Sequence, residues 1–356
     1  MPGSTRNTSL SALSLKRICH NHFPMRLNIF IISFLISLSL FGCKDKRIKD
    51  SGVTLQLDSI YCRDPFIVAD KATKTYYLYR SSTTPEGLGG VEVFKSKDLK
   101  GWSGPERVFT VPADNFITGT VWAPEVHEYK GKWYLFATLN TDRKWAEDVE
   151  GWPAFKYRGT QIFRADSPAG PFLPLGKELT TPKDYMALDG TLWVEDGVPY
   201  MVFCHEWVQI VDGTYEVMPL KEDLSGAAGE PVVLFKASDG KWSTGGSYWT
   251  DPDGGKRKSY VSDGPFLYKT SGGDLLMLWS SFRDKYCVAL ARSVSGKLAG
   301  PWTCDDEPIF TEDGGHSMLF KDFDGNLNLV FHQPNSGFSH PVILPLKDTG
   351  HTIELE

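Results

Sequence analysis

The sequence predicts an all-β protein built as a five-bladed β-propeller. A short β-prone run recurs five times between residues 59 and 356, and a polar motif precedes each run. The runs begin at Tyr76, Trp133, Tyr200, Leu275 and Leu327. Repeats of about 60 residues, each long enough for three or four strands, are typical of sheets arranged around a central axis. A pair of β-sandwiches would not space one acidic or histidine motif per unit so evenly.

The five polar motifs define the units in order. They are Arg63-Asp64-Pro65-Phe66, Trp122-Ala123-Pro124-Glu125, Leu188-Asp189-Gly190-Thr191, Asp263-Gly264-Pro265-Phe266 and Gly315-His316. Turn signals such as Lys130-Gly131-Lys132 separate most motifs from the run that follows. A third strand then leads in several units to a shared ending, seen in Gly170-Pro171-Phe172 and Gly300-Pro301-Trp302.

The composition of the chain indicates which class of partner it binds. The 356 residues carry 38 Lys and Arg against 44 Asp and Glu, a net charge of −6, and no basic stripe runs along the chain. This balance argues against nucleic acid as the partner. Aromatic residues make up 13% of the chain, and glycines number 34. That mixture suits short strands, tight turns and flat rings on which sugars stack. We expect a monomer.

The first 58 residues predict export. Residues 27–41 are mainly apolar, and they are too few for a membrane-spanning helix, which needs about 20. Basic residues precede them, as in a signal peptide. The stretch ends in Leu40-Phe41-Gly42-Cys43, which resembles the lipobox of bacterial lipoproteins. We expect residues 1–43 to be the signal peptide with its lipobox, residues 1–24 to be an over-extended start, and residues 44–58 to be a polar tether.

These expectations define a location. Cys43 would carry the lipid and anchor the chain to a membrane of the cell envelope, as an outer-membrane, periplasmic or surface-facing lipoprotein. The propeller would span residues 59–356. Its cysteines, Cys62, Cys204, Cys287 and Cys304, show no Cys-x-x-Cys spacing, which argues against zinc. An exported chain can form disulfides, but the spacing does not assign a pairing.

Propeller geometry brings the motifs together. The innermost strands of all blades run beside the axis, so the residues that open them converge at one end of the channel. These positions carry Asp64, Glu125, Asp189, Asp263 and His316. A single Asp before Pro or Gly is usually a turn residue. Several carboxyl groups in one pocket instead predict a functional site.

Such a site suits glycoside hydrolysis. One carboxyl group donates a proton to the leaving oxygen, and an ionised carboxylate activates water or attacks the sugar. A third acid nearby keeps the donor protonated. The sequence has no Gly-x-Ser-x-Gly elbow, phosphate loop or dinucleotide fingerprint, which argues against those chemistries.

The ordered motifs resemble glycoside hydrolase family 43 over about residues 58–356. The resemblance rests on Arg63-Asp64-Pro65-Phe66, Trp122-Ala123-Pro124-Glu125-Val126, Leu188-Asp189-Gly190-Thr191-Leu192, Asp263-Gly264-Pro265-Phe266-Leu267-Tyr268-Lys269 and Gly314-Gly315-His316. It implies a five-bladed propeller that hydrolyses glycosidic bonds with inversion, mostly on plant polysaccharides containing arabinose and xylose.

The resemblance also implies roles for individual residues. Asp64 matches the general base, and Asp189 matches the acid that tunes and orients the proton donor. No cofactor is required, although His316 resembles an axial histidine beside a calcium or sodium ion. The sugar would bind against an aromatic wall and nearby polar groups. We expect this binding set to comprise Trp122, Glu125, His205, Trp207 and Phe66.

The proton donor departs from the family pattern. Family members usually open the fourth blade with Glu-Gly-Pro or Glu-Ala-Pro, whereas this chain has Asp263, one methylene shorter. Three interpretations stay open: Asp263 is still the acid, Glu206 has replaced it, or the protein binds glycans without cleaving them. Glu206 is favoured because it follows the second strand of its blade, whose end lies near Asp189. Asp263 would then hold a sugar hydroxyl or tune the donor.

The sequence thus predicts a lipid-anchored, inverting glycosidase acting on terminal units. Removal of α-L-arabinofuranosyl units is favoured, followed by β-xylosyl or β-galactosyl units. The alternative is a non-catalytic glycan-binding lipoprotein on the same propeller.

Overall fold

A computed structural model describes residues 54–356. The expected signal peptide, the lipobox and most of the expected tether lie outside these residues. Among the residues described, no helix combines the length and hydrophobicity needed to cross a bilayer. The backbone of Leu55 pairs with that of Trp102 in both directions. The last part of the segment expected to be a tether is therefore joined to the first blade.

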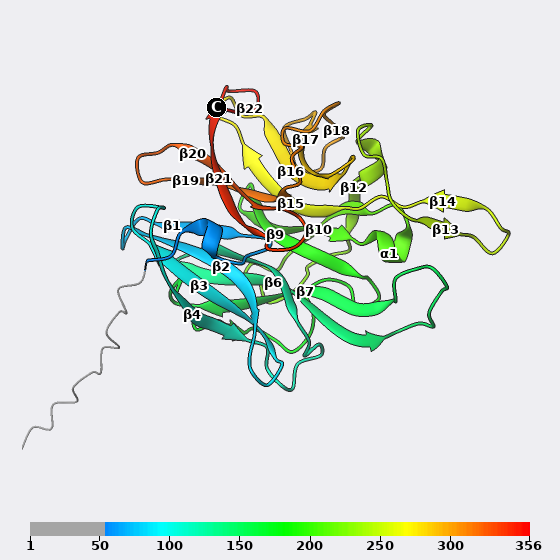
Figure 1. The fold of residues 1–356 in the computed structure, drawn as a ribbon, viewed down its shortest axis with the longest axis horizontal. Helices are drawn as coiled ribbons and strands as arrows, with labels where there is room; N and C mark the ends of the chain where they lie inside the picture. Colours follow the sequence, from blue (N-terminus) through cyan, green and yellow to red (C-terminus); the bar gives the residue numbers. More distant parts are fainter. Residues whose placement is uncertain (1–53) are drawn as a thin grey trace, which may run out of the picture. The chain divides into compact units, whose positions relative to one another are not determined.

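Residues 54–356 form five four-stranded antiparallel sheets, as the repeats predict (Figure 1). Blade I contains β1 (Phe66–Asp70), β2 (Thr75–Thr83), β3 (Gly89–Ser96) and β4 (Trp102–Thr110). Blade II contains β5 (Val121–Tyr129), β6 (Lys132–Lys144), β7 (Lys156–Ala165) and β8 (Leu173–Pro174). Blade III contains β9 (Ala187–Glu195), β10 (Val198–His205), β11 (Thr214–Pro219) and β12 (Val232–Lys236).

The remaining two blades follow the same order. Blade IV contains β15 (Asp263–Lys269), β16 (Leu275–Phe282), β17 (Tyr286–Ser293) and β18 (Trp302–Cys304). Blade V contains β19 (Gly315–Lys321), β20 (Leu327–Gln333), β21 (His340–Asp348) and β22 (Ile353–Leu355). Outside the blades lie the hairpin β13 (Tyr248–Thr250) with β14 (Lys256–Lys258), the helix α1 (Trp207–Ile210), and the 3-10 turns Leu57–Ser59 and Ala237–Asp239.

The first strand of every blade lies at the axis. Each of β1, β5, β9, β15 and β19 contacts the next, and β19 returns to contact β1, so the ring closes. Apolar residues fill the space between neighbouring blades. Between blades III and IV, for example, Trp279 packs against Tyr215 and Phe235. The four cysteines within residues 54–356 are unpaired.

An irregularity recurs where each inner strand opens. One residue there has a positive φ, a conformation that costs an ordinary L-residue roughly 1–2 kcal/mol. The φ values are 50° at Asp64, 41° at Ala123, 57° at Asp189, 54° at Gly264 and 51° at His316. The pairing register shifts at this position in blades II to V. Such bulges re-aim side chains. Three of these five residues, Asp64, Asp189 and His316, meet beside the axis.

The bulges correct the repeat alignment expected from the sequence. Ala123 and Gly264, rather than Glu125 and Asp263, are the structural counterparts of Asp64. Glu125 lies two residues farther along the strand, where it is buried. Asp263 immediately precedes the bulge residue of its blade, so its side chain approaches the axis from a different backbone position.

Candidate active site

The inner strands open into a cavity of about 760 Å³, within the usual range for small-molecule sites. Its lining contains six residues that the sequence predicted to react or to bind sugar. They are Asp64, Trp122, Asp189, Glu206, Trp207 and Asp263. They belong to blades I to IV and are separated by up to about 200 residues of chain. The fold therefore gathers four carboxyl groups and two indole rings in one place.

Three residues of the expected binding set lie elsewhere. Phe66 is buried and packs with its ring centroid 5.2 Å from that of His127. Glu125 hydrogen-bonds with the same histidine, at 2.8 Å from Nε2. His205 is buried, and its ring stacks on Tyr185 with the centroids 3.9 Å apart. None of the three lines the cavity, because each points from its strand into the packed interior.

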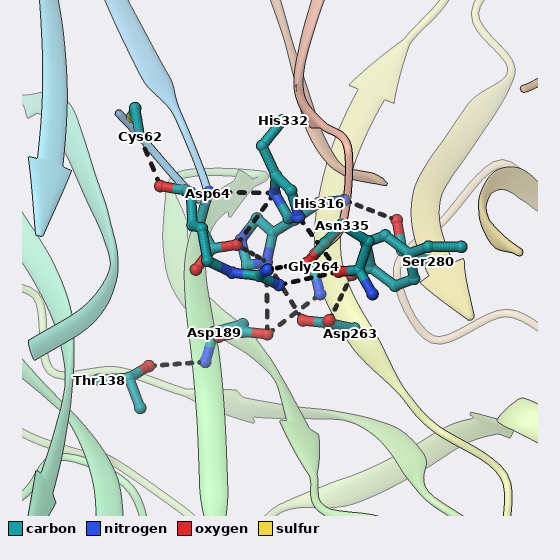
Figure 2. A network of polar contacts seen from close by, with 12 residues as sticks. Cys62, Asp64, Thr138, Asp189, Asp263, Gly264, Ser280, His316, His332 and Asn335 are labelled. Carbon is teal, nitrogen blue, oxygen red and sulfur yellow. Dashed lines mark hydrogen bonds and ion pairs between the residues drawn. The ribbon is translucent and has the colours of Figure 1, made fainter. Parts of the chain in front are cut away.

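Three carboxyl groups surround the imidazole of His316 (Figure 2). Its Nδ1 lies 3.2 Å from Oδ1 of Asp263, 3.4 Å from Oδ1 of Asp64 and 3.8 Å from Oδ2 of Asp189. The hydroxyl of Ser280 accepts a hydrogen bond from the His316 backbone N–H at 2.9 Å. Burial by itself would lower the pKa of His316, but the carboxyl groups outweigh it and hold that pKa well above its usual range. His316 is therefore an imidazolium at neutral pH.

Asp189 and Asp263 are two neighbouring carboxyl groups whose protonation is coupled. Burial and the neighbouring carboxylates raise the pKa of Asp189 well above its ordinary value. Burial would also raise the pKa of Asp263, but hydrogen bonds from His316, Asp189 and Tyr286 lower it instead. The Tyr286 hydroxyl donates directly to Oδ2 of Asp263. The two groups therefore titrate as a coupled pair in which these contacts favour the proton on Asp189.

Asp64 is ionised as well. Burial opposes its charge, but His316 and His332 outweigh burial and lower its pKa below the ordinary value. The Asp64 backbone N–H donates to Nδ1 of His332 at 3.2 Å, which holds the strained residue in place. A carboxylate in this state can accept a proton from water.

In contrast to Asp64, Glu206 has a carboxyl group whose pKa is raised. Burial raises the pKa of its carboxyl group, and the charge of Asp263 adds to the rise. The nearby Arg158 opposes it, because its Nη1 donates to Oε2 of Glu206. Glu206 directly follows β10 and occupies the N-cap position of α1, where its side chain makes no capping bond. Its backbone N–H donates to the Met186 carbonyl at 2.8 Å. Asp189 and Glu206 are thus the two acids of the cavity lining whose pKa is raised, and Glu206 is the one paired with Arg158.

Four polar residues of this network were absent from the sequence prediction: Asn140, Arg158, Tyr286 and His332. Strand direction could have indicated two of them. The third strand of a blade runs parallel to the first, so its opening residues reach the same rim. Tyr286 opens β17 and Arg158 lies near the start of β7. No local motif marks either position, and only the repeat places them.

The positions of the acids and of His316 bear on the expected calcium or sodium ion beside His316. Ligand atoms of Asp189, Asp263 and His316 lie within 4.8 Å of one another, a spacing compatible with a bound ion. Calcium, however, takes six to eight oxygen ligands. A cation at this place would compete with the Nδ1 proton of His316, because a protonated nitrogen has no lone pair to offer. Asp189 and Asp263 would supply its oxygen ligands.

Three relatives share much of the chain. It is 26% identical over 287 residues to an "Extracellular exo-alpha-(1->5)-L-arabinofuranosidase" of Streptomyces avermitilis, and 28% identical over 289 residues to "Alpha-L-arabinofuranosidase 43" of Humicola insolens. Each match covers 76% of this chain and 54% of the relative, so the chain spans about half the length of these curated relatives. The crystal structure of an endo-arabinase from Bacteroides thetaiotaomicron is 38% identical, with a TM-score of 0.71, over 84% of this chain and 99% of that one.

The family follows from these findings together. The model of "Glycosyl hydrolases family 43" matches residues 59–351, which is nearly all of the propeller. The five blades, the convergent carboxyl groups and the 38% identical structure agree with that match. This chain belongs to glycosyl hydrolase family 43.

Proposed function

We propose that this chain is an inverting glycoside hydrolase that releases terminal glycosyl units from plant-type polysaccharides or oligosaccharides. The observation that carries the proposal is one cavity lined by an ionised Asp64 and by Glu206, whose pKa is raised. Two of the relatives are named as arabinofuranosidases and one as an endo-arabinase, which favours α-L-arabinofuranosyl units. β-Xylosyl and β-galactosyl units are the next candidates, on the resemblance of the sequence motifs alone.

In the proposed reaction, Asp64 takes a proton from a water molecule whose oxygen attacks the anomeric carbon. Glu206 gives its proton to the glycosidic oxygen as the bond from the anomeric carbon to that oxygen breaks. Because water attacks from the face opposite the leaving group, the product has the inverted anomeric configuration. The reaction leaves Asp64 protonated and Glu206 ionised, and exchange with solvent restores both.

Electrostatics favours Glu206 over Asp263 as the proton donor. Asp263 accepts hydrogen bonds from His316 and Tyr286, which stabilise its ionised form. An ionised Asp263 raises the pKa of Glu206, so Asp263 serves as a tuning charge. Asp189 acts one step farther away, because it donates a hydrogen bond to Asp263 rather than contacting Glu206.

The shape of the cavity supports action on chain ends. Asp64, Asp189 and Asp263 line it near the axis, where they contact the buried His316, and the lining residue Trp122 is 40% exposed. A terminal sugar would enter toward the axis, and an indole ring is a suitable stacking surface for it.

Wild-type enzyme is expected to release free arabinose from linear α-1,5-arabino-oligosaccharides from the first time point. Chromatography of the products checks this, with β-1,4-xylo-oligosaccharides run in parallel. Initial formation of shorter oligosaccharides without arabinose would contradict action on chain ends. Absence of turnover on every substrate, with sugar binding still measurable, would favour a glycan-binding protein.

Glu206→Gln is expected to lower kcat/KM on an arabino-oligosaccharide by about 10²–10⁴-fold, the usual contribution of a general acid. Nitrophenyl arabinofuranoside should lose much less activity, because its leaving group needs little protonation. Wild-type kcat/KM should fall as pH rises through the raised pKa of Glu206, since the donor must be protonated. Asp263→Asn is the matched variant. If Asp263→Asn, and not Glu206→Gln, loses activity on the oligosaccharide while it keeps activity on the nitrophenyl substrate, Asp263 is the acid.

We further propose that the chain is an envelope lipoprotein anchored through Cys43, which the lipobox-like sequence supports. Expressed in a bacterium with labelled palmitate, the wild-type protein should carry the label and fractionate with membranes. Cys43→Ala should remove the label. Unlabelled wild-type protein in the soluble fraction would contradict the proposal.

A further inference from the structure

Arg158 contacts two residues of the cavity, the proposed proton donor Glu206 and the exposed Trp122. It is 7% exposed, and it lies near the start of β7, at the same rim as the opening of the inner strands. Its Nη1 donates to Oε2 of Glu206, and its guanidinium carbon lies 4.3 Å from the centre of the Trp122 ring. Within residues 54–356, Arg158 is the one ion-pair partner of Glu206.

A second hydrogen bond, to Asn140, also holds the guanidinium of Arg158. Its Nε donates to Oδ1 of Asn140, a buried residue whose backbone N–H donates to the Thr120 carbonyl at 2.8 Å. The planar guanidinium thus has a defined orientation, with one edge on Glu206 and one face on Trp122. A lysine could supply the charge but neither the fork nor the flat face.

We propose that Arg158 is a positioning residue that holds the Glu206 carboxyl and the Trp122 ring in one fixed relation. A sugar stacked on Trp122 then has its glycosidic oxygen within reach of the Glu206 proton. The inference rests on the proposed function, because it assumes that Glu206 is the acid. It extends that function by assigning the alignment of donor and sugar to a residue that contacts both.

The same contact stabilises the carboxylate that Glu206 becomes when it has given up its proton. A positive charge beside a carboxyl group favours the ionised form. The titratable groups that act on Glu206 come from three strands: Arg158 from β7, His205 from β10 and Asp263 from β15. Helix α1, which follows Glu206, contains no charged residue. Arg158 and Asp263 act in opposite directions, so their removal should move the pH profile in opposite directions.

The test compares Arg158→Met, Arg158→Lys and Glu206→Gln, together with the double variant that combines Glu206→Gln with Arg158→Met. Arg143→Met is the matched control, because Arg143 also lies over aromatic rings, those of Phe116 and Tyr157, but it has no contact with Glu206. Each protein is assayed from pH 4 to 10 on the arabino-oligosaccharide and on nitrophenyl arabinofuranoside.

Arg158→Met should shift the basic limb of kcat/KM upward by about one to two pH units, the effect of losing a hydrogen bond from a charged group. It should lower kcat on the oligosaccharide by about 10²-fold through misalignment of the donor. Arg158→Lys should keep the basic limb of the kcat/KM profile close to its wild-type pH, but its kcat should be lowered as in Arg158→Met. In the Glu206→Gln background, Arg158→Met should cost little further kcat, since the donor is already absent. Arg143→Met should match wild type.

The outcomes separate the two proposals. If Glu206→Gln cleaves the oligosaccharide at the wild-type rate, the acid assignment fails, whatever Arg158 does. If Glu206→Gln shows the loss expected of an acid but the Arg158 variants keep the wild-type limb and kcat, the inference about Arg158 is overturned. Fully additive losses in the double variant would also overturn it. Should Arg158→Met fail to fold, as judged by circular dichroism, Arg158→Lys and its kcat carry the test.

Discussion

The site depends on one charge balance, in which the imidazolium of His316 offsets the carboxylates packed around its Nδ1. Two carboxylates about 5 Å apart repel each other by about 3 kcal/mol at an effective dielectric constant of 20. The axial groups Asp189, Asp263 and His316 are packed within that distance. The protonated histidine and the proton kept on Asp189 remove most of this cost. Asp64 and Asp263 can therefore stay ionised although they are half-buried. The charge on Asp263 adds to the effect of burial, which raises the pKa of Glu206.

The backbone is strained where it places these groups. A residue with positive φ opens every inner strand, and in four of the five blades it is not a glycine: Asp64, Ala123, Asp189 and His316. Neighbouring groups restrain these residues, as when the Gly264 N–H donates to Oδ2 of Asp189 at 3.1 Å and the Asp189 N–H donates to Thr138 at 2.8 Å. Strain held at a functional site by the surrounding fold is a common arrangement. Here it aims the side chains along the axis, where a regular strand would turn them into the blade.

Much of the fold and part of the site could be predicted from the sequence, because both follow the repeat. The recurring β-prone runs fixed the number of blades, and the motifs located Asp64 and Asp189. Periodicity failed at Glu125, because a bulge moves the axial position of that blade to Ala123. It also missed Arg158 and His332, which approach the site from other strands and carry no motif. Protonation states were beyond the sequence, since they depend on distances between blades.

The central claim is that Glu206, and not Asp263, faces the glycosidic oxygen while Asp64 faces the attacking water. A crystal structure of the Asp64→Asn variant with an uncleaved arabino-oligosaccharide tests it most directly. We expect a Glu206 carboxyl oxygen within hydrogen-bond distance of the glycosidic oxygen, and the terminal sugar against Trp122. A complex in which Asp263 makes that contact, with Glu206 held away by Arg158, would contradict the account.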